Sequence, residues 1–442
     1  MNSEKILDSS RSIQKKFSPF ITLPNKLVSN TRKGPLSGIM VSVKDNICTK
    51  TKGMQTTAGS KILEGYIPPF NATCIDRVLE AGGTILGKTA MDEFGFGTFS
   101  VNCAYGIPKN PLDPERSCGG SSGGAACVAA TADFPHVALA ESTGGSISCP
   151  AAFTGTVGLT PTYGLVSRWG LIDYANSLDK IGCMGKTVKD VAKLLSVIAG
   201  HDPKDSTSLQ VGKQDYTKHL KVSVKGMRIG VPKEYFEGVD ERVSKAVWGA
   251  VGKLESMGAA LTEISLPHTK YALPAYYIIA MAEASTNLAK YAGMRYGLHK
   301  ELKGNFDEYF SSVRTNGFGE EAKRRIILGT FARMAGYRDA YYLKALKVRT
   351  KVIEDFKQAF RKFDVLAAPT MPLVAPKFDE ISKLSPIEVY MMDILTVAPN
   401  LAGIPMISVP AGTVDKMPVG LHLMADHLQE GKILQAANSY AQ

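Results

Sequence analysis

Short runs of β-branched and other apolar residues recur along the chain and predict buried strands. A run of four to eight such residues between turn-forming residues is typical of a strand that is covered on both faces. We expect strands at residues 39–43, 84–86, 137–140, 227–231, 260–266, 365–368, 406–409 and 419–424. Their spacing leaves room for helices between most of them.

Apolar residues with helical spacing fill many of these intervals. They predict helices at residues 73–80, 123–131, 188–198, 243–257, 275–291, 320–334 and 339–363. Alternation of strands and helices favours an α/β fold with a large mixed sheet flanked by helices. We expect one domain over residues 1–442, in which the more helical segment 200–362 forms a lobe covering the site and 202–221 forms a polar connection.

Composition sets outer limits on the function. The 442 residues, of which 44% are hydrophobic, can bury a large core and an enclosed site. The 52 Lys and Arg residues outnumber the 41 Asp and Glu residues, so the net charge of +11 favours an anionic partner such as nucleic acid or an acidic protein. The lysines are scattered and carry no RNA-reading signature, so direct contact with nucleic acid stays open.

Seven cysteines all lie within the first 183 residues. No two of them form a C-x-x-C pair and their number is odd, which argues against a zinc site and against a disulfide framework. We expect most of these thiols to act as small buried apolar groups in a reducing compartment. A cysteine nucleophile, Cys118 or Cys149, remains an alternative because both lie close to the serine motifs described below.

The first 20 residues mix charged residues and serines without an apolar core, which excludes a secretory signal. A cytoplasmic location is expected, with a mitochondrial location as the alternative. No apolar run reaches the roughly 18 residues that a membrane-spanning helix needs. The most apolar stretch, 271–284, is interrupted by Pro274 and Glu283.

Residues 119–124 read Gly-Gly-Ser-Ser-Gly-Gly. Glycines permit backbone conformations closed to other residues and let N–H groups approach a ligand. A phosphate-binding loop is one alternative, but the Gly-Lys-Ser/Thr ending is missing. A flexible linker is another, which the apolar helix expected directly after the motif disfavours.

A second motif, Glu-Ser-Thr-Gly-Gly-Ser-Ile at residues 141–147, directly follows the strand expected at 137–140. Its last serine, Ser146, is therefore at a strand exit. Backbone N–H groups at such a turn can hold an oxyanion, and each donor typically stabilises a transition state by about 3 to 4 kcal/mol. A structural turn rich in Gly and Ser is the alternative.

Lys44 follows the strand expected at 39–43, so an apolar segment directs its amine toward the interior. Lysines at strand ends more often point into water, which is the alternative here. To act as a base near neutral pH the amine must be uncharged, and a dry, glycine-lined pocket favours that form. Two serines and one lysine are sufficient for acyl transfer without histidine.

These three segments together resemble the amidase signature family, and the likeness covers nearly the whole chain. The resemblance implies a base, Lys44; a bridging serine on a cis peptide, Ser121; and a nucleophile, Ser146. It further implies an oxyanion hole formed by the N–H groups of Thr143, Gly144 and Gly145. The implied reaction is attack of Ser146 on an amide carbonyl, release of ammonia and hydrolysis of the acyl-serine.

Further segments resemble the branch of that family that works in tRNA-dependent amidotransferases. They lie at residues 91–94, 161–168, 177–180, 232–235, 282–287, 294–297, 323–326 and 400–403. The resemblance implies that Arg325 binds the α-carboxylate of glutamine, that Asp393 binds its α-amino group and that Tyr276 lines the pocket. A free amino acid carries both charges, so a buried site must meet each with its opposite. Surface charges on helices are the alternative for Arg325 and Asp393.

The same branch implies a glutamine amidohydrolase that delivers ammonia to partners amidating misacylated tRNA, either Glu-tRNA(Gln) or Asp-tRNA(Asn). The implied partners are a small third subunit and a B-type amidotransferase subunit. No ATP-binding motif is present, so ATP and Mg are expected at the partner subunit, and this chain is expected to bind no cofactor or metal. The alternatives are a stand-alone amidase on another small amide and a catalytically silent scaffold subunit.

The chain departs from the family pattern near the second motif. Ser142 stands where the family commonly has Asp, and Ser148 where it commonly has Arg; Cys118 replaces a proline and Thr160 a lysine. Removing both partners of a buried ion pair costs less than removing one. Our hypothesis is therefore that Ser142 and Ser148 replace a pair that was lost together.

Overall fold

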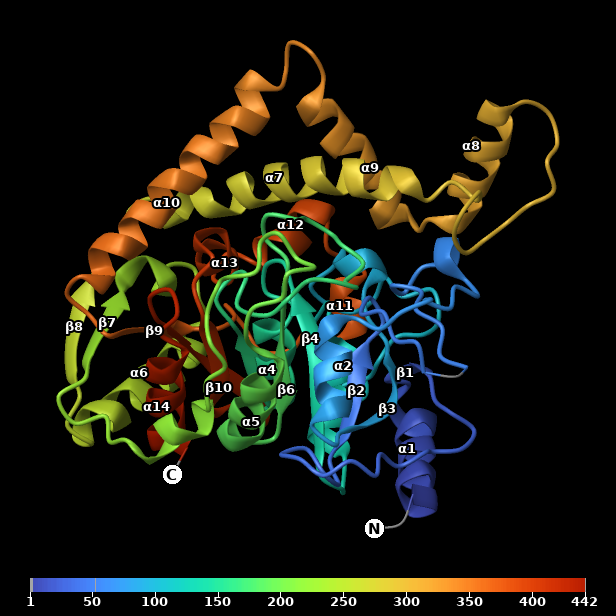
Figure 1. The fold of residues 1–442 in the computed structure, drawn as a ribbon. Coiled ribbons are helices and arrows are strands. Elements are labelled where there is room, and N and C mark those ends of the chain that lie inside the picture. Colours follow the sequence, from blue (N-terminus) through green and yellow to red (C-terminus); the bar gives the residue numbers. More distant parts are fainter. Residues whose placement is uncertain (1–2, 52, 442) are drawn as a thin grey trace.

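One mixed sheet forms the centre of the computed structural model, which describes residues 3–51 and 53–441 (Figure 1). Within these residues the sheet has 11 strands in the order β1-β3-β2-β4-β6-β5-β10-β11-β9-β7-β8. β3, β2 and β4 run parallel, as do β9, β7 and β8, and the strands between these two groups pair antiparallel. The predicted α/β class with a large mixed sheet is confirmed.

All eight predicted strands are present. The strands are β1 (Phe20–Thr22), β2 (Met40–Lys44), β3 (Thr84–Thr89), β4 (His136–Ser142), β5 (Val157–Thr160), β6 (Lys180–Gly185), β7 (Arg228–Pro232), β8 (Ala260–Ile264), β9 (Val365–Pro369), β10 (Met406–Val414) and β11 (Met417–Met424). The expectation that β8 is buried is wrong, because it is an edge strand with only β7 beside it and its residues are largely exposed. β1, β5 and β6 were not predicted.

The seven predicted helices are also present. The helices are α1 (Ser3–Phe17), α2 (Thr73–Glu80), α3 (Gly123–Thr131), α4 (Ser148–Thr154), α5 (Val188–Ile198), α6 (Glu241–Ser256), α7 (Ala272–Asn287), α8 (Phe306–Gly317), α9 (Glu320–Arg333), α10 (Lys344–Phe360), α11 (Phe378–Ile381), α12 (Pro386–Met391), α13 (Val397–Ala402) and α14 (Glu430–Ala441). The helix expected at 339–363 begins with a π-helical turn before α10. The helix expected at 275–291 ends in a 3₁₀ turn after α7.

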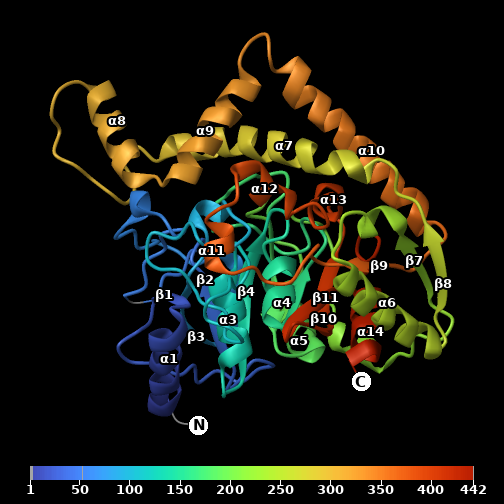
Figure 2. The same cartoon turned by 180° about the vertical axis from the view of Figure 1, so that it is seen from behind.

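Helices cover the sheet on both faces. α2, α5, α6 and α14 lie on the face seen in Figure 1, and their apolar residues join one large core with β2, β7 and β10. α3 and α4 lie on the opposite face, seen in Figure 2, where alanines of α3 and α4 pack closely against β4. Small residues let these two helices approach the strand, and the serine motifs lie immediately before them.

Long helices of the segment 200–362 cross above one end of the sheet. α7, α9 and α10 form this layer at the top of Figure 1, above α12 and α13. α7 packs against α9, α10 and α13, and its apolar residues join a second core that includes Phe94 and Tyr174. The same segment also supplies β7 and β8 to the main sheet. The extent of the domain and of the covering lobe stays a prediction.

No helix in residues 3–51 and 53–441 is long and apolar enough to cross a membrane.

Candidate active site

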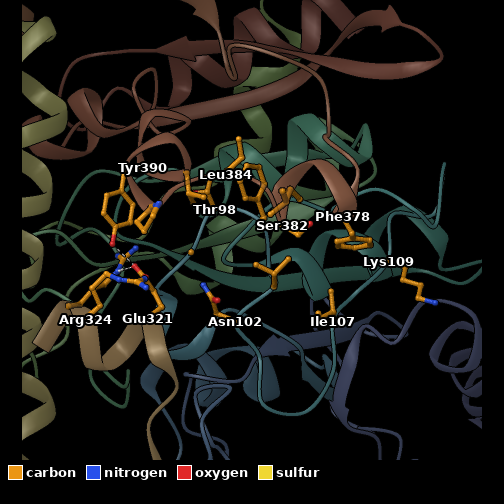
Figure 3. A pocket seen from close by; sticks show the side chains of 17 residues that line it. Thr98, Asn102, Ile107, Lys109, Glu321, Arg324, Phe378, Ser382, Leu384 and Tyr390 are labelled. Atoms are coloured by element: carbon orange, nitrogen blue, oxygen red, sulfur yellow. Dashed lines mark hydrogen bonds and ion pairs between the residues drawn. The ribbon is translucent and has the colours of Figure 1, made fainter.

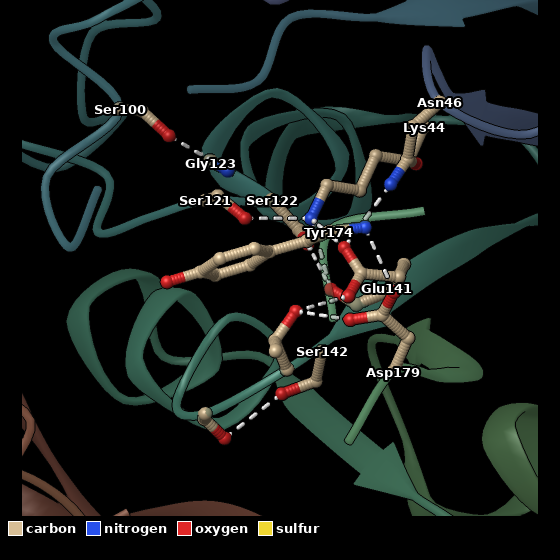
Figure 4. Close-up of polar contacts among 12 residues, drawn as sticks. Lys44, Asn46, Ser100, Ser121, Ser122, Gly123, Glu141, Ser142, Tyr174 and Asp179 are labelled. Carbon is tan, nitrogen blue, oxygen red and sulfur yellow. Dashed lines mark hydrogen bonds and ion pairs between the residues drawn. The ribbon is translucent and has the colours of Figure 1, made fainter. Parts of the chain in front are cut away.

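Lys44 is the last residue of β2, and its side chain is fully buried. Its Nζ donates to the Ser121 Oγ at 2.7 Å, to the main-chain carbonyl of Glu141 at 2.9 Å and to Glu141 Oε2 at 3.0 Å (Figure 4). β2 and β4 run parallel, so their ends meet at the same edge of the sheet. The amine therefore lies in the interior, and the alternative of a lysine pointing into water is wrong.

Ser121 lies in the loop before α3, and its peptide bond with Gly120 is cis, as the resemblance implied. The loop packs on Asp92, and a Cβ at position 120 would collide with Asp92 Oδ2, so only glycine fits there. Asp92 accepts from the N–H groups of Ser100 at 2.8 Å and Asn102 at 2.9 Å. Burial raises the pKa of Asp92 to about 6. The first motif is thus a packed loop and not a linker.

Ser146 lies in the turn between β4 and α4. Its carbonyl oxygen accepts from the N–H of Ser122 at 3.2 Å, which ties the two serine motifs together. Ser146 is 6% exposed, whereas Lys44 and Ser121 are 0% exposed, so it is the member of the trio that a substrate can reach. Within the described chain the Ser146 Oγ has no hydrogen-bond partner, and no hydrogen bond joins it to Ser121.

Glu141, the second-last residue of β4, is a site residue that the sequence reasoning missed. It is 1% exposed, its Oε2 accepts from Lys44 and from Asn46 Nδ2 at 3.1 Å, and its Oε1 lies 2.8 Å from Thr143 Oγ1. The same hydroxyl lies 2.7 Å from Asp179 Oδ1. Burial and the neighbouring Glu141 raise the pKa of Asp179. An acidic residue ending an apolar strand, directly before Ser-Thr-Gly-Gly-Ser, was the available signal.

The glycines of the turn make room for α7 and for the segment before α13. A Cβ on Gly144 would lie 2.8 Å from the Tyr276 hydroxyl, and one on Gly145 would lie 2.5 Å from Thr396 Oγ1. Tyr276 is 4% exposed and reaches the turn from α7. The structure thus brings Tyr276 against Gly144 in the turn formed by Thr143, Gly144 and Gly145. The role of these three as an oxyanion hole stays a prediction.

Arg325 projects from α9 into an aromatic enclosure and is 3% exposed. Its Nε donates to Glu321 Oε1 at 2.7 Å and its Nη1 to the Tyr174 hydroxyl at 2.6 Å. The guanidinium lies 5.2–5.6 Å from the ring centroids of Phe96, Tyr174, Tyr277 and Tyr390. Such rings attract a cation through their faces. The alternative of a surface charge on a helix is therefore wrong for Arg325.

Asp393 is likewise inside the molecule, at 8% exposure. Its Oδ2 accepts from the Tyr277 hydroxyl at 2.6 Å and from Thr98 Oγ1 at 3.1 Å. Burial raises the pKa of Asp393, while the Tyr277 hydrogen bond and the Arg325 charge oppose that shift. Tyr277 thus stands between a buried cation and a buried carboxyl group, the pair of charges that an amino acid zwitterion requires.

A cavity of about 660 Å³ opens beside Arg325 and Thr98 (Figure 3). Its apolar wall consists of Phe99, Val101, Ile107, Phe378, Leu384 and Val389, and Glu321 and Tyr390 add polar groups. Lys44 and the two serines do not line it. Thr98 connects the cavity with the loop that holds Ser121, because its carbonyl accepts from the N–H of Gly120 at 2.6 Å. A residue that lines the cavity is therefore in contact with the loop that carries the cis peptide.

The cysteine alternative finds no support in the geometry. Cys118 and Cys149 are fully buried, and burial raises the pKa of both thiols well above the usual value. A thiol must ionise to act as a nucleophile, so neither group is activated. The expectation that most cysteines are small buried groups is confirmed, since all but Cys103 are buried.

Ser142 and Ser148 are both fully buried, and each has a partner of its own. The Ser142 hydroxyl donates to the Gly144 carbonyl at 2.9 Å, and the Ser148 hydroxyl lies 3.5 Å from His422 Nε2. Whether the two replace a lost ion pair stays a hypothesis. In the described residues, no cluster of three His, Cys, Asp or Glu side chains is arranged to hold a metal ion.

Known proteins resemble the chain over most of its length. The family model described as Amidase matches residues 22–434. The A subunit of glutamyl-tRNA(Gln) amidotransferase from Methanococcoides burtonii is 53% identical over 408 residues, covering 92% of this chain and 85% of that protein. The protein of the same name in Carboxydothermus hydrogenoformans is 52% identical and covers 94% and 85%.

Solved structures agree with these sequence relatives. The A subunit of glutamyl-tRNA(Gln) amidotransferase from Thermotoga maritima superposes with a TM-score of 0.84 at 38% identity, covering 99% of this chain and 91% of that one. The peptide amidase of Stenotrophomonas maltophilia gives a TM-score of 0.82 at 28% identity, covering 100% and 93%.

Proposed function

The chain belongs to the amidase family, and from that premise we propose that it hydrolyses glutamine and supplies the ammonia that converts Glu-tRNA(Gln) to Gln-tRNA(Gln). The relatives that are about half identical carry the name of that amidotransferase's A subunit. Asp-tRNA(Asn) is the alternative acceptor. The relevant compartment is the cytoplasm, with the mitochondrion as the alternative.

One observation carries the proposal. The Lys44 amine contacts the Ser121 hydroxyl at 2.7 Å in a fully buried site, next to the turn that holds Ser146. A buried amine beside a hydroxyl is what proton transfer from a serine nucleophile requires. The enclosed pair of Arg325 and Asp393 supplies the two charges that a glutamine zwitterion needs.

In the proposed reaction, Lys44 accepts a proton through Ser121 as the Ser146 Oγ attacks the amide carbon of glutamine. The N–H groups of Thr143, Gly144 and Gly145 hold the resulting oxyanion. The relayed proton passes to the leaving nitrogen, the C–N bond breaks and ammonia departs. Water then attacks the acyl-serine and releases glutamate.

We assign the remaining steps to partner subunits. Ammonia in bulk water is lost as ammonium, so it must pass to the acceptor within a complex. The proposed partners are a B-type amidotransferase subunit, which uses ATP and Mg to activate the tRNA-linked acid, and a small third subunit. Misacylated tRNA joins through the complex, and this chain binds no cofactor in this scheme.

A self-sufficient amidase is the second candidate, favoured by the apolar wall of the 660 Å³ cavity, which suits an amide larger and less polar than glutamine. A silent scaffold is the third. Glutamine turnover that stays weak in the absence of charged tRNA and the B-type subunit supports the amidotransferase role. Rapid hydrolysis of apolar amides by the chain alone would favour the second candidate.

The test is ammonia release from glutamine by the chain, alone and with its partners, for wild type, Ser146→Ala and Lys44→Ala. Removing a catalytic nucleophile or base usually lowers turnover on the order of 10³-fold or more, so both variants should lose that much. Ser146→Ala should retain the wild-type unfolding transition, whereas Lys44→Ala leaves the buried Glu141 carboxylate unpaired and should unfold more easily. Wild-type turnover in Ser146→Ala would contradict the proposal, and covalent labelling of Ser146 by an amide-like electrophile would exclude the scaffold.

A further inference from the structure

Glu141 adds a second proton acceptor beside Lys44, and we propose that its carboxylate takes the proton that Lys44 must lose in order to act as a base. The inference rests on the proposed function, because it concerns the activation of the same serines. It makes Glu141 a fourth member of the proton relay, behind the lysine.

The positions of the three groups support a relay. The Lys44 Nζ contacts the Ser121 Oγ at 2.7 Å and Glu141 Oε2 at 3.0 Å. All three side chains are at most 1% exposed. Bulk water therefore has no direct contact with this amine, and the Glu141 carboxylate is the anionic group that contacts it.

The Thr143 hydroxyl indicates which of the two nearby acids carries the negative charge. It has one proton but lies within 2.8 Å of both Glu141 Oε1 and Asp179 Oδ1, so it donates to one and must accept from the other. Burial and the charge of Glu141 raise the pKa of Asp179, while hydrogen bonds from Thr143 and from the Ala175 N–H oppose that shift. In the proposed resting state Asp179 carries the proton and donates to Thr143. Thr143 then donates to Glu141.

Glu141 therefore receives three donors, from Lys44, Asn46 and Thr143. Three donors on two oxygens suit an ionised carboxylate. The proposed resting site therefore pairs a Lys44 ammonium with a Glu141 carboxylate. A free amine need not exist before the substrate arrives.

Each proton in the proposed step has a donor and an acceptor. One N–H proton of Lys44 moves to Glu141 Oε2, and the freed lone pair takes the proton of the Ser121 hydroxyl. Ser121 takes the proton of Ser146, whose Oγ bonds to the amide carbon. The negative charge thus moves from Glu141 to the tetrahedral oxygen. When the C–N bond breaks, the same transfers run backward and deliver one proton to the leaving nitrogen, which departs as ammonia.

Other charged groups around the relay come from several elements. Asp92 acts on Lys44 from the loop after β3, and Asp179 faces Glu141 from the segment before β6. Arg168 acts on Asp179 from the loop after β5. All three remain when only Glu141 is changed, so a comparison of variants isolates the Glu141 carboxylate.

The test is the pH dependence of kcat/KM for glutamine, measured on the assembled complex from about pH 6 to pH 10. The variants are Glu141→Gln, which replaces the proton-accepting carboxylate by an amide of the same shape, and Glu141→Asp, which keeps a carboxylate. Glu430→Gln is the matched control, because Glu430 is equally buried at the start of α14 and its Oε1 accepts from the Thr162 N–H.

The kcat/KM of Glu141→Gln should be at least about tenfold lower than that of wild type near pH 7. It should then rise about tenfold per pH unit, because Lys44 must first lose its proton to solvent. Glu141→Asp and Glu430→Gln should keep the shape of the wild-type profile. A Glu141→Gln rate within about twofold of wild type near pH 7 would overturn the proposal. So would an equal loss at every pH, which is the signature of a purely structural role.

A measurement on the wild-type complex covers the case in which Glu141→Gln does not fold. An aldehyde analogue of glutamine forms a tetrahedral adduct on Ser146, and the difference infrared spectrum should gain the band of a protonated carboxyl group. Absence of that band overturns the Glu141 proposal. Wild type that releases no ammonia, or Ser146→Ala that releases it normally, would instead overturn the proposed function.

Discussion

Single residues in this site owe their properties to what surrounds them. Arg325 lies on a helix whose outer residues are exposed, yet its own guanidinium is enclosed by four aromatic rings and Glu321. An arginine suits such an enclosure because its planar group can stack on rings and still offer paired N–H donors to a carboxylate. A lysine offers a point charge and cannot do both.

Arg325→Lys should therefore weaken glutamine binding more than it slows the chemistry. A charge-assisted hydrogen bond contributes about 1.5 to 3 kcal/mol, so KM should rise about 10- to 100-fold while kcat changes less. Steady-state kinetics with glutamine measure this. Butyramide, which lacks the α-carboxylate, is the control and should show the same KM in both proteins; an unchanged KM for glutamine would contradict the assigned role.

Among the elements, β4 and the turn after it organise the site. β4 ends with Glu141 and Ser142, the turn holds Ser146, and α4 begins at Ser148. The Ser142 hydroxyl donates a hydrogen bond to the Gly144 carbonyl, and this bond stabilises the glycine turn. A carboxylate at that position has no proton to donate and would face the same carbonyl.

Ser142→Asp should therefore destabilise the protein by about 3 kcal/mol, the usual cost of an unpaired buried charge. The double variant Ser142→Asp/Ser148→Arg should recover much of that loss if the two positions once held an ion pair. Urea unfolding measures both, and Ser142→Ala separates loss of the hydroxyl from gain of the charge. A single variant as stable as the double would refute the lost-pair hypothesis.

In the molecule as a whole, the wide sheet buries polar groups as well as apolar ones. His136 in β4 and His422 in β11 are both buried, and burial lowers the pKa of each to about 3. The unfolded chain binds these protons near the usual pKa of about 6.5, so between about pH 6.5 and 3 it holds more protons than the native state. Their contribution to stability is present above that window and is lost as the pH falls through it.

His136→Gln should therefore lower the pH at which the protein unfolds in acid. Each pKa unit corresponds to about 1.4 kcal/mol, so the effect amounts to several kcal/mol at about pH 3 to 4. Circular dichroism across an acid titration measures it. His201→Gln, at an exposed histidine, is the control and should behave as wild type; an unchanged midpoint in His136→Gln would contradict the predicted burial effect.

Local patterns in the chain were sufficient to predict most of the architecture. Eight strands, seven helices and the mixed sheet follow from apolar spacing, because that spacing records which residues must leave water. β5 and β6 escaped prediction because each is interrupted by glycine, and β6 also begins with Lys180, a residue usually found at surfaces. The extent of the domain and the roles of the proposed triad stay predictions.

The order of the strands and the way the helices cross them decide which side chains from distant parts of the chain come into contact. β2 lies beside β4 although β3 comes between them in the chain, and this arrangement brings the Lys44 amine into contact with the Glu141 carboxylate. Arg325 and Asp393 meet around Tyr277 because α7 and α9 pack together over one end of the sheet. A hydrophobic pattern specifies that a residue is buried but not its neighbours, so the carboxylate beside the lysine emerged only from the folded chain.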